Sequence, residues 1–125
     1  MPVKISWQVN NRILLVTGFD EVTFEDLNPV NDLLLATLKN DTVHLIVDRR
    51  LITKYPLNII KLKNTLSSLN HPNFGWLLVV DEQDAMRDFL IGIVTQLMRT
   101  PFRRMETLDD AITFLYQHDK TLSRV

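Results

Sequence analysis

The residues with the clearest capacity for binding chemistry lie close together in the middle of the chain. They are charged or hydrogen-bonding side chains that follow a short apolar run: Asp48, Arg49, Arg50, Thr53, Lys54 and Tyr55. Two guanidinium groups and an ammonium group near the start of a helix can hold a phosphate, a carboxylate or an acidic loop of a partner protein. A tyrosine beside arginines is also the composition of an interface anchor. We therefore take this segment as the candidate site for a partner or an anion.

The charge around this segment is one-sided. Between Asp48 and Asp81 there is no acidic residue, whereas five basic residues give a formal charge of +5 in a chain whose net charge is −1. The alternative interpretation is an ordinary charged surface, on which Asp48 pairs with one arginine and the other charges are solvated.

A second polar group follows the next apolar run and comprises Asp81, Glu82 and Asp84. If the two runs are parallel strands, this group lies near Asp48, and together the carboxylates could hold a divalent cation. Acidic residues at the start of a helix need no ligand, however, because the helix dipole favours them there. Helix capping is therefore the favoured interpretation of this group.

The other reactive side chains form no recognisable catalytic motif. His44, His71 and His118 lack the spacing of metal ligands, and Ser67 and Ser68 lie in a predicted helix without flanking glycines. The chain has no cysteine, which excludes a disulfide, a thiolate nucleophile and a cysteine metal site. We expect no enzymatic activity and no cofactor.

Composition indicates one globular unit. A chain of 125 residues, 46% of them hydrophobic, can bury one core, so we expect a single domain over residues 1–125. The 14 basic and 15 acidic residues nearly cancel, so the whole chain has no strong field for nucleic acid or membrane surfaces. Its apolar runs are too short to span a bilayer, and its beginning does not have the pattern of an export signal. The expected location is the cytoplasm.

Hydrophobic periodicity predicts strands that alternate with helices. The predicted strands are residues 3–9, 12–19, 43–47, 74–80 and 101–106, and the predicted helices are residues 23–38, 58–69, 81–100 and 107–118. The first two strands form a hairpin that turns at Asn10 and Asn11. Strands that alternate with helices pair in parallel through right-handed crossovers. The expected fold is α/β, with a mixed sheet of about five strands and about four helices.

Two of the predicted helices leave alternatives open. In the first, Thr23 can cap the helix, but Pro29 then lies beyond the first turn, so the helix could instead begin at Asn28 with Pro29 as its first residue. In the third, Ile91 and Gly92 widen the apolar face beyond one stripe. That helix either packs against a second subunit in a homodimer or is deeply buried.

The order of these elements resembles the STAS domains of anti-sigma factor antagonists and anion transporter tails. The stretch "LIVDRR" before an amphipathic helix and the closing "FRRMETLDDAITFL" carry the resemblance, with Asp48 at the end of the central strand and Ala111 in the last helix. The sequence is most similar to the stand-alone, SpoIIAA-like bacterial branch. The resemblance implies a STAS-like fold and a regulatory protein whose partner is a kinase-like anti-sigma factor or a sensor.

The sequence departs from that family where its members are phosphorylated. In switchable antagonists, an Asp-Ser pair stands at the start of the helix after the central strand, whereas this chain has Pro56 and Leu57 at about that place. Thr53 is the nearest hydroxyl and does not match the motif. We therefore do not expect a phosphoserine switch, although the partner-binding surface beside it could remain.

Three functions follow from these residues, and the first is the leading one. It is a non-enzymatic regulatory module that docks a partner protein through residues 48–57 and the helix after them. The second is a sensor that holds a nucleotide or an acyl carboxylate at Arg49, Arg50 and Lys54. The third is an enzyme that uses Asp48 and Asp81 to bind a metal.

Overall fold

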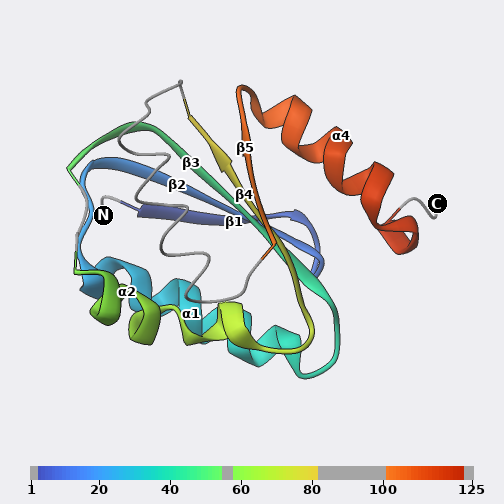
Figure 1. Ribbon diagram of the computed structural model, residues 1–125, viewed down its shortest axis with the longest axis horizontal. Helices are drawn as coiled ribbons and strands as arrows, with labels where there is room; N and C mark the ends of the chain where they lie inside the picture. Colours follow the sequence, from blue (N-terminus) through green and yellow to red (C-terminus); the bar gives the residue numbers. More distant parts are fainter. Residues whose placement is uncertain (1–2, 55–57, 82–100, 123–125) are drawn as a thin grey trace.

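A five-stranded sheet forms the centre of the molecule. The computed structural model describes residues 3–54, 58–81 and 101–122 (Figure 1). The strands lie side by side in the order in which they occur in the chain: β1 (Val3–Val9), β2 (Ile13–Glu21), β3 (Val43–Lys54), β4 (Phe74–Val80) and β5 (Phe102–Met105). The pair β1–β2 is antiparallel and the other pairs are parallel, so the predicted mixed sheet is confirmed.

The helices described in these ranges are α1 (Phe24–Leu38), α2 (Ile59–Thr65) and α4 (Leu108–His118), together with the short 3₁₀ turns η1 (Ser67–Asn70) and η2 (Lys120–Leu122). Three α-helices therefore lie in the described ranges, against about four predicted for the whole chain. The predicted helix over residues 81–100, with its proposed role in a homodimer, lies almost wholly outside the described residues. None of the described helices has the length and apolar character that crossing a membrane requires.

The turn of the first hairpin is one residue longer than predicted. Three residues, rather than two, separate β1 from β2, because Arg12 donates its backbone N–H to the carbonyl of Val9 and stays in the turn. Asn11 has a φ of 62°, a left-handed conformation that asparagine tolerates better than most residues. The asparagine pair therefore marks the turn as predicted, but the second strand begins at Ile13.

Thr23 caps α1 as predicted, and the alternative start at Asn28 is wrong. The Thr23 hydroxyl accepts a hydrogen bond from the backbone N–H of Asp26, and the Asp26 carboxylate accepts one from the backbone N–H of Thr23. This reciprocal capping box satisfies two N–H groups at the helix start. It holds the first turn in place although Pro29, which cannot donate a backbone hydrogen bond, lies inside the helix.

The central strand is more than twice as long as predicted. It runs over the 12 residues Val43–Lys54, so the expectation that Asp48 ends the strand is wrong. The neighbouring strand β2 continues beside it, and this pairing holds the charged residues in extended conformation. β3 accommodates them with bulges, since it has one residue more than β2 between Asp48 and Leu51 and another between Ile52 and Lys54.

The second predicted helix is divided. α2 ends at Thr65, Leu66 leaves the helical conformation with φ −105° and ψ 46°, and the chain continues as η1. The amide side chain of Asn31 in α1 accepts a hydrogen bond from the backbone N–H of Ser68, at 2.8 Å, and so fixes this break against α1. Ser68 is buried, and its position is explained by packing.

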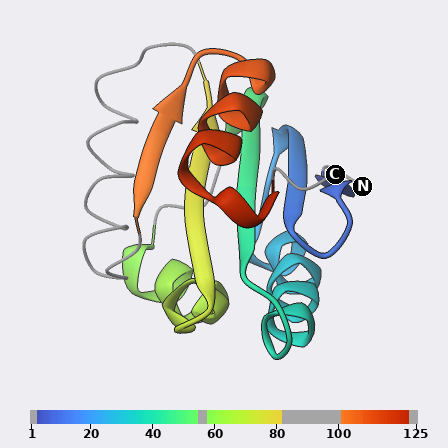
Figure 2. The same ribbon diagram turned by 90° about the vertical axis from the view of Figure 1, so that its right-hand side faces the viewer.

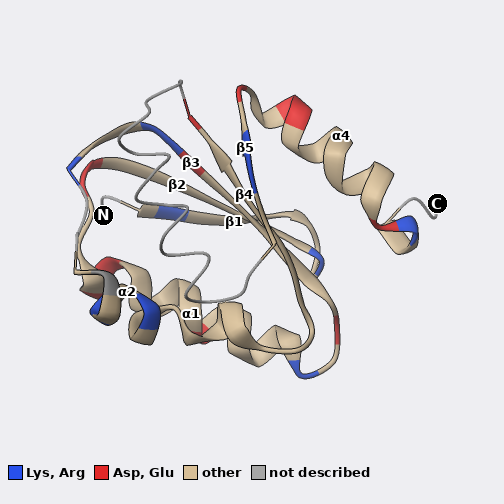
Figure 3. Ribbon diagram, viewed as in Figure 1, with Lys and Arg blue, Asp and Glu red and all other residues tan. Residues whose placement is uncertain are grey.

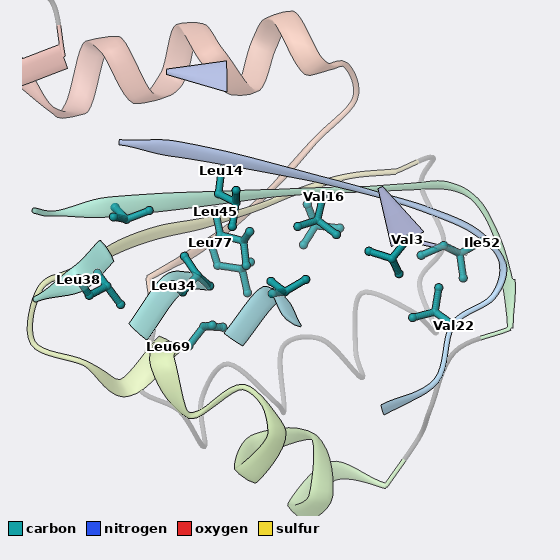
Figure 4. Packing of buried hydrophobic residues seen from close by; sticks show 13 residues of the cluster. Val3, Leu14, Val16, Val22, Leu34, Leu38, Leu45, Ile52, Leu69 and Leu77 are labelled. Atoms are coloured by element: carbon teal, nitrogen blue, oxygen red, sulfur yellow. The ribbon is translucent and has the colours of Figure 1, made fainter. Parts of the chain in front are cut away.

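Each face of the sheet carries its own apolar cluster, because neighbouring residues of a strand point to opposite sides. One cluster packs against α1 and includes Leu14, Leu34, Leu45, Leu69 and Leu77 (Figure 4). The other packs against α4, which crosses the opposite face of the sheet (Figure 2), and includes Ile13, Ile46, Leu78, Ala111 and Leu115. Burial of each Leu or Ile side chain contributes about 1.5–3 kcal/mol to folding. The predicted covering of the central strand on both faces is confirmed.

Candidate functional site

The predicted site lies on the second half of β3. We call residues 49–54 the β3 extension. β4 pairs with β3 only as far as Asp48, which is opposite Val80, whereas β2 pairs with β3 as far as Lys54. The β3 extension and the end of β2 therefore continue together away from β4 and β5 (Figure 1). Basic residues mark this end of β3 in Figure 3.

Asp48 and Arg50 form an ion pair within the strand. Arg50 donates from Nε to Oδ1 of Asp48 at 3.0 Å and from Nη2 to Oδ2 at 2.7 Å, and its backbone N–H also donates to Oδ1. The hydrogen bond from the Arg50 side chain is the main reason that the pKa of Asp48 lies below its usual value, and the same bond raises the pKa of Arg50. The carboxylate is charged at neutral pH, and it occupies one side of the guanidinium.

Arg49 is buried, contrary to the interpretation in which the remaining charges are solvated. Its Nε lies 3.6 Å from Oδ2 of Asp81, which is buried as well. Arg104 in β5 donates to the backbone carbonyl of Asp81 at 3.0 Å. A charge removed from water is tolerated in a protein when an opposite charge lies beside it. Arg49 and Asp81 therefore join β3 to the end of β4 as a structural pair.

Outward-facing residues on the β3 extension make up its accessible surface. Thr53 and Lys54 are exposed, and Leu51 between them and Arg50 is 61% exposed. Ile60, in the first turn of α2, is 70% exposed. Among the described residues, these are the two exposed large hydrophobic side chains, and they flank residues 55–57. Tyr55, Pro56 and Leu57 lie outside the described residues.

Sequence reasoning missed Leu51 and Ile60. The predicted strand ends at Asp48 and leaves the orientation of Leu51 open, whereas in the structure Ile52 is buried and Leu51 is exposed. Strict alternation from Leu45 and Val47 would have placed Leu51 on the α1 face, but the bulge between Asp48 and Leu51 shifts the alternation and places Ile52 there instead. Ile60 lies outside the predicted apolar stripe of Ile59, Leu62, Leu66 and Leu69, so a helical projection would have placed it on the outer surface.

The acidic residues do not gather into a metal site in the described part of the chain. Asp48 is bound by Arg50, and Asp81 lies beside Arg49. Across residues 3–54, 58–81 and 101–122, no three or more histidine or carboxylate groups are close enough to hold a metal ion. Glu82 and Asp84, the other members of the predicted group, lie outside the described residues.

This arrangement of a mixed sheet, with α1 and α2 on one face and α4 on the other, is the SpoIIAA-like, or STAS-like, fold. A solved structure with this fold is that of an uncharacterized protein of the DUF3478 family from Shewanella loihica PV-4, which shares 16% sequence identity with this chain at a TM-score of 0.66. The alignment covers 90% of this chain and 91% of that one. The predicted STAS-like fold is therefore confirmed.

Two structures of SpoIIAA itself also match. The anti-sigma factor antagonist SpoIIAA in its unphosphorylated form has 11% identity and a TM-score of 0.57, with 92% of this chain and 97% of that chain covered. The Bacillus cell fate determinant SpoIIAA in the phosphorylated form has 10% identity and a TM-score of 0.60, with 90% and 98% covered. No protein-family model and no curated protein matches the sequence. At these identities the similarity defines the fold, and the function has to be argued from the site.

Proposed function

We propose that this chain is a non-enzymatic regulatory module of the cytoplasm that binds a protein partner through the β3 extension and the beginning of α2. The observation that carries the proposal is the exposure of Leu51, in the middle of a strand where its neighbour Ile52 is buried. The proposed interface residues are Asp48, Arg49, Arg50, Leu51, Thr53, Lys54, Tyr55 and Ile60.

Apolar side chains provide the centre of the proposed interface. Burial of a leucine or isoleucine side chain is favourable by about 1.5–3 kcal/mol, so Leu51 and Ile60 offer a partner a gain that the free protein does not use. Leu51 lies on a strand that the core holds in place through Ile46 and Ile52, and Ile60 lies on a helix that contacts α1 and whose start is capped by Asn58. A preformed surface binds with a smaller entropy loss than a mobile loop.

Charge defines the chemistry of the partner. Arg50 and Lys54 flank Leu51, and Lys61 follows Ile60 in α2, where its Nζ lies 4.9 Å from the centre of the Phe24 ring. A partner surface with an apolar centre and a carboxylate rim therefore suits this site, because opposite charges at the rim accelerate and orient association. The similarity of fold to an anti-sigma factor antagonist makes a kinase-like anti-sigma factor or a sensor protein the first class of partner to examine.

The anion-sensor alternative has less support in the geometry. Arg50 already binds Asp48, and Arg49 is buried beside Asp81. A nucleotide or acyl carboxylate at these arginines would have to displace a carboxylate in each case. Docking uses the same strand without breaking either ion pair.

The test is a binding comparison in two stages. Wild-type protein first captures partners from host lysate, and each captured protein is then purified and titrated against wild type, Leu51→Asp and Ile60→Asp. We expect each variant to weaken binding by about 30-fold or more, as for an interface hot spot of about 2 kcal/mol. Thr113→Asp is the matched control, because Thr113 is exposed on α4 and receives the same charge.

Arg49 is unsuitable as a test position because its substitution disturbs a buried ion pair. Arg50→Glu is the better charge reversal, since the Arg50 side chain is 45% exposed. Folding of every variant is checked by circular dichroism. Equal affinity of the wild type and Leu51→Asp for all captured proteins would refute the proposed interface.

A further inference from the structure

A buried histidine ties the end of α4 to the sheet. His44, near the start of β3, is 3% exposed. Its Nδ1 accepts a hydrogen bond from the backbone N–H of Trp76 in β4 at 2.9 Å, and its Nε2 lies 2.8 Å from Oδ2 of Asp119. A backbone N–H can only donate, so Nδ1 carries the lone pair and Nε2 carries the proton. The geometry therefore selects the neutral ring, which donates to Asp119.

Asp119 is the point where several elements meet. It is the C-cap of α4, and its carboxylate also accepts hydrogen bonds from Arg12 Nη2 at 2.9 Å and from the backbone N–H of Thr121 in η2 at 3.0 Å. Arg12 in turn donates from Nε to the carbonyl of Thr42 at 2.8 Å. The carboxylate thus joins the hairpin turn, the start of β3 and η2 to the end of α4.

The His44 ring has no room to adjust on the side of β4. A Cβ atom added to Gly75 would lie 2.2 Å from Nδ1 and 2.3 Å from Cε1 of His44, so the imidazole packs directly on the backbone of that strand. A proton added at Nδ1 would face the Trp76 N–H across this contact. Two donors would then point at each other, and the ring could keep its position only at the loss of a buried hydrogen bond.

We propose that His44 and Asp119 form an acid-sensitive latch, which holds the end of α4 and η2 on the sheet when His44 is neutral and releases them when Nδ1 is protonated. The inference goes beyond the proposed docking function. The latch lies at the beginning of β3 and the β3 extension lies at its end. An experiment can therefore refute one proposal without refuting the other.

Asp119 and Arg12 act on the pKa of His44 in opposite directions, and burial decides the outcome. Burial is the largest influence on His44 and lowers its pKa from 6.5, more than the hydrogen bond and charge of Asp119 raise it, and Arg12 also lowers it. For Asp119, burial raises the pKa, but hydrogen bonds from Thr121 and His44 outweigh it and bring the pKa to about 2. Asp119 therefore stays charged across the pH range in which histidine titrates.

The sign of the pH dependence follows from these states. In the unfolded or released chain His44 takes up a proton near its ordinary pKa, whereas in the latched state it resists protonation. The latch is consequently at full strength above a pH of about 6.5 and weakens as the pH falls below it. Release uncovers apolar surface, because Leu115 in α4 and Leu122 in η2 pack on Ile13 and Ile46 of the sheet.

Hydrogen exchange followed by NMR tests the latch in the full chain, at pH about 7.5 and about 5.5, after correction for intrinsic exchange. In the wild type we expect the amides of residues 115–119 and 122 to lose protection at the lower pH while the amides of β2 and β3 keep theirs. The loss should be several-fold and should not exceed about tenfold, because pH 5.5 lies one unit below the ordinary histidine pKa of about 6.5 that applies in the released state. His44→Gln, which cannot titrate and keeps a donor toward Asp119, should abolish this pH dependence.

His118→Gln is the matched control, because His118 is an exposed histidine on the same helix whose hydrogen bond goes to the carbonyl of Phe114 in that helix, and whose ring contact with Trp76 does not involve the backbone N–H that binds His44. It should leave the pH dependence unchanged. Equal loss of protection in α4, β2 and β3, or no loss in α4, overturns the latch. If His44→Gln does not fold, nitrogen-15 NMR of the wild-type imidazole decides at neutral pH: a proton on Nε2 alone supports the proposal, and a proton on Nδ1 refutes it.

Discussion

Asp48 and Arg50 bind each other within one strand, while Arg49 between them is buried beside Asp81. Side chains two positions apart in a strand point to the same face, so Arg50 can reach back to the carboxylate of Asp48. Three consecutive charged residues therefore have different roles: the buried Asp48 pairs with the more exposed Arg50, and Arg49 joins two strands.

The pair of Asp48 and Arg50 should contribute to stability although Arg50 is partly exposed. Arg50→Ala leaves the buried Asp48 carboxylate without two hydrogen bonds, so we expect it to lower the free energy of unfolding by about 1–3 kcal/mol. The pKa of Asp48 should rise in this variant, since the hydrogen bond from Arg50 is the main cause of its low value. Urea denaturation and an NMR titration of the Asp48 carboxyl group measure the two effects.

The pH dependence of this pair has a definite sign. The pKa of Asp48 is lower in the folded chain than its ordinary value of 3.8, so its contribution is present above pH 3.8 and is lost as the pH falls toward the folded value. Lys54→Ala, at an exposed basic residue of the same strand, should leave the Asp48 titration in place. An unchanged titration in Arg50→Ala would contradict the assignment.

The pair of Arg49 and Asp81, in which both side chains are buried, should contribute more to stability than the pair of Asp48 and Arg50. Asp81→Asn leaves Arg49 as a buried charge beside a neutral amide, and we expect a loss of about 3–5 kcal/mol in the free energy of unfolding. The double variant Arg49→Met with Asp81→Leu removes both charges and should be more stable than Asp81→Asn. Asp109→Asn on the exposed surface of α4 is the control for the loss of one carboxylate and should change stability by less than about 0.5 kcal/mol. A double variant that is less stable than Asp81→Asn would argue against an ion pair between Arg49 and Asp81.

Gly18 in β2 is required by the packing of the β3 extension. A Cβ at this position would lie 2.4 Å from Cδ1 of Ile52, so Gly18→Ala should destabilise the protein by about 1–3 kcal/mol. Ile52→Val removes that Cδ1 atom. In a double-mutant cycle, the cost of Gly18→Ala should be smaller in the Ile52→Val background than in the wild type. Strictly additive effects would show that the two side chains do not collide.

The cap of α1 makes a measurable local contribution. Thr23→Ala removes the hydroxyl that accepts from the Asp26 N–H and leaves a helix N–H without that partner. We expect a loss of about 1 kcal/mol in thermal or urea unfolding. Thr113→Ala, at an exposed position inside α4, should change the free energy of unfolding by less than about 0.5 kcal/mol. Equal effects of the two substitutions would contradict a specific capping role.

Local signals were sufficient for much of the fold. Period-two alternation identifies β1, and the Asn10–Asn11 pair identifies its turn, because these depend on residues close in sequence. The length of β3 depends instead on β2, which supplies hydrogen-bonding partners as far as Lys54. Nothing within the stretch "DRRLITK" indicates that pairing, and charged residues there favoured a loop.

The candidate site was predictable as a segment and less so in its details. The sequence pattern drew attention to Asp48, Arg49 and Arg50, but burial of Arg49 is decided by Asp81, which is 32 positions later. The interaction of His44 was even harder to predict from local sequence, since its partner Asp119 lies 75 positions away. Interactions over such separations depend on the completed topology, and one sequence contains no local sign of them.

The order of strands has a consequence for how the protein reaches its native state. Each described strand lies beside the one before it in the chain, so β1 to β5 can be added to the sheet in succession, each over a short stretch of intervening chain. Closing such stretches costs less chain entropy than pairing strands that are distant in the chain, which favours stepwise growth of the sheet during synthesis. The bond between His44 and Asp119 spans 75 residues and cannot form until α4 has emerged. We therefore expect folding to begin at the amino-terminal hairpin and to end when α4 packs on the sheet.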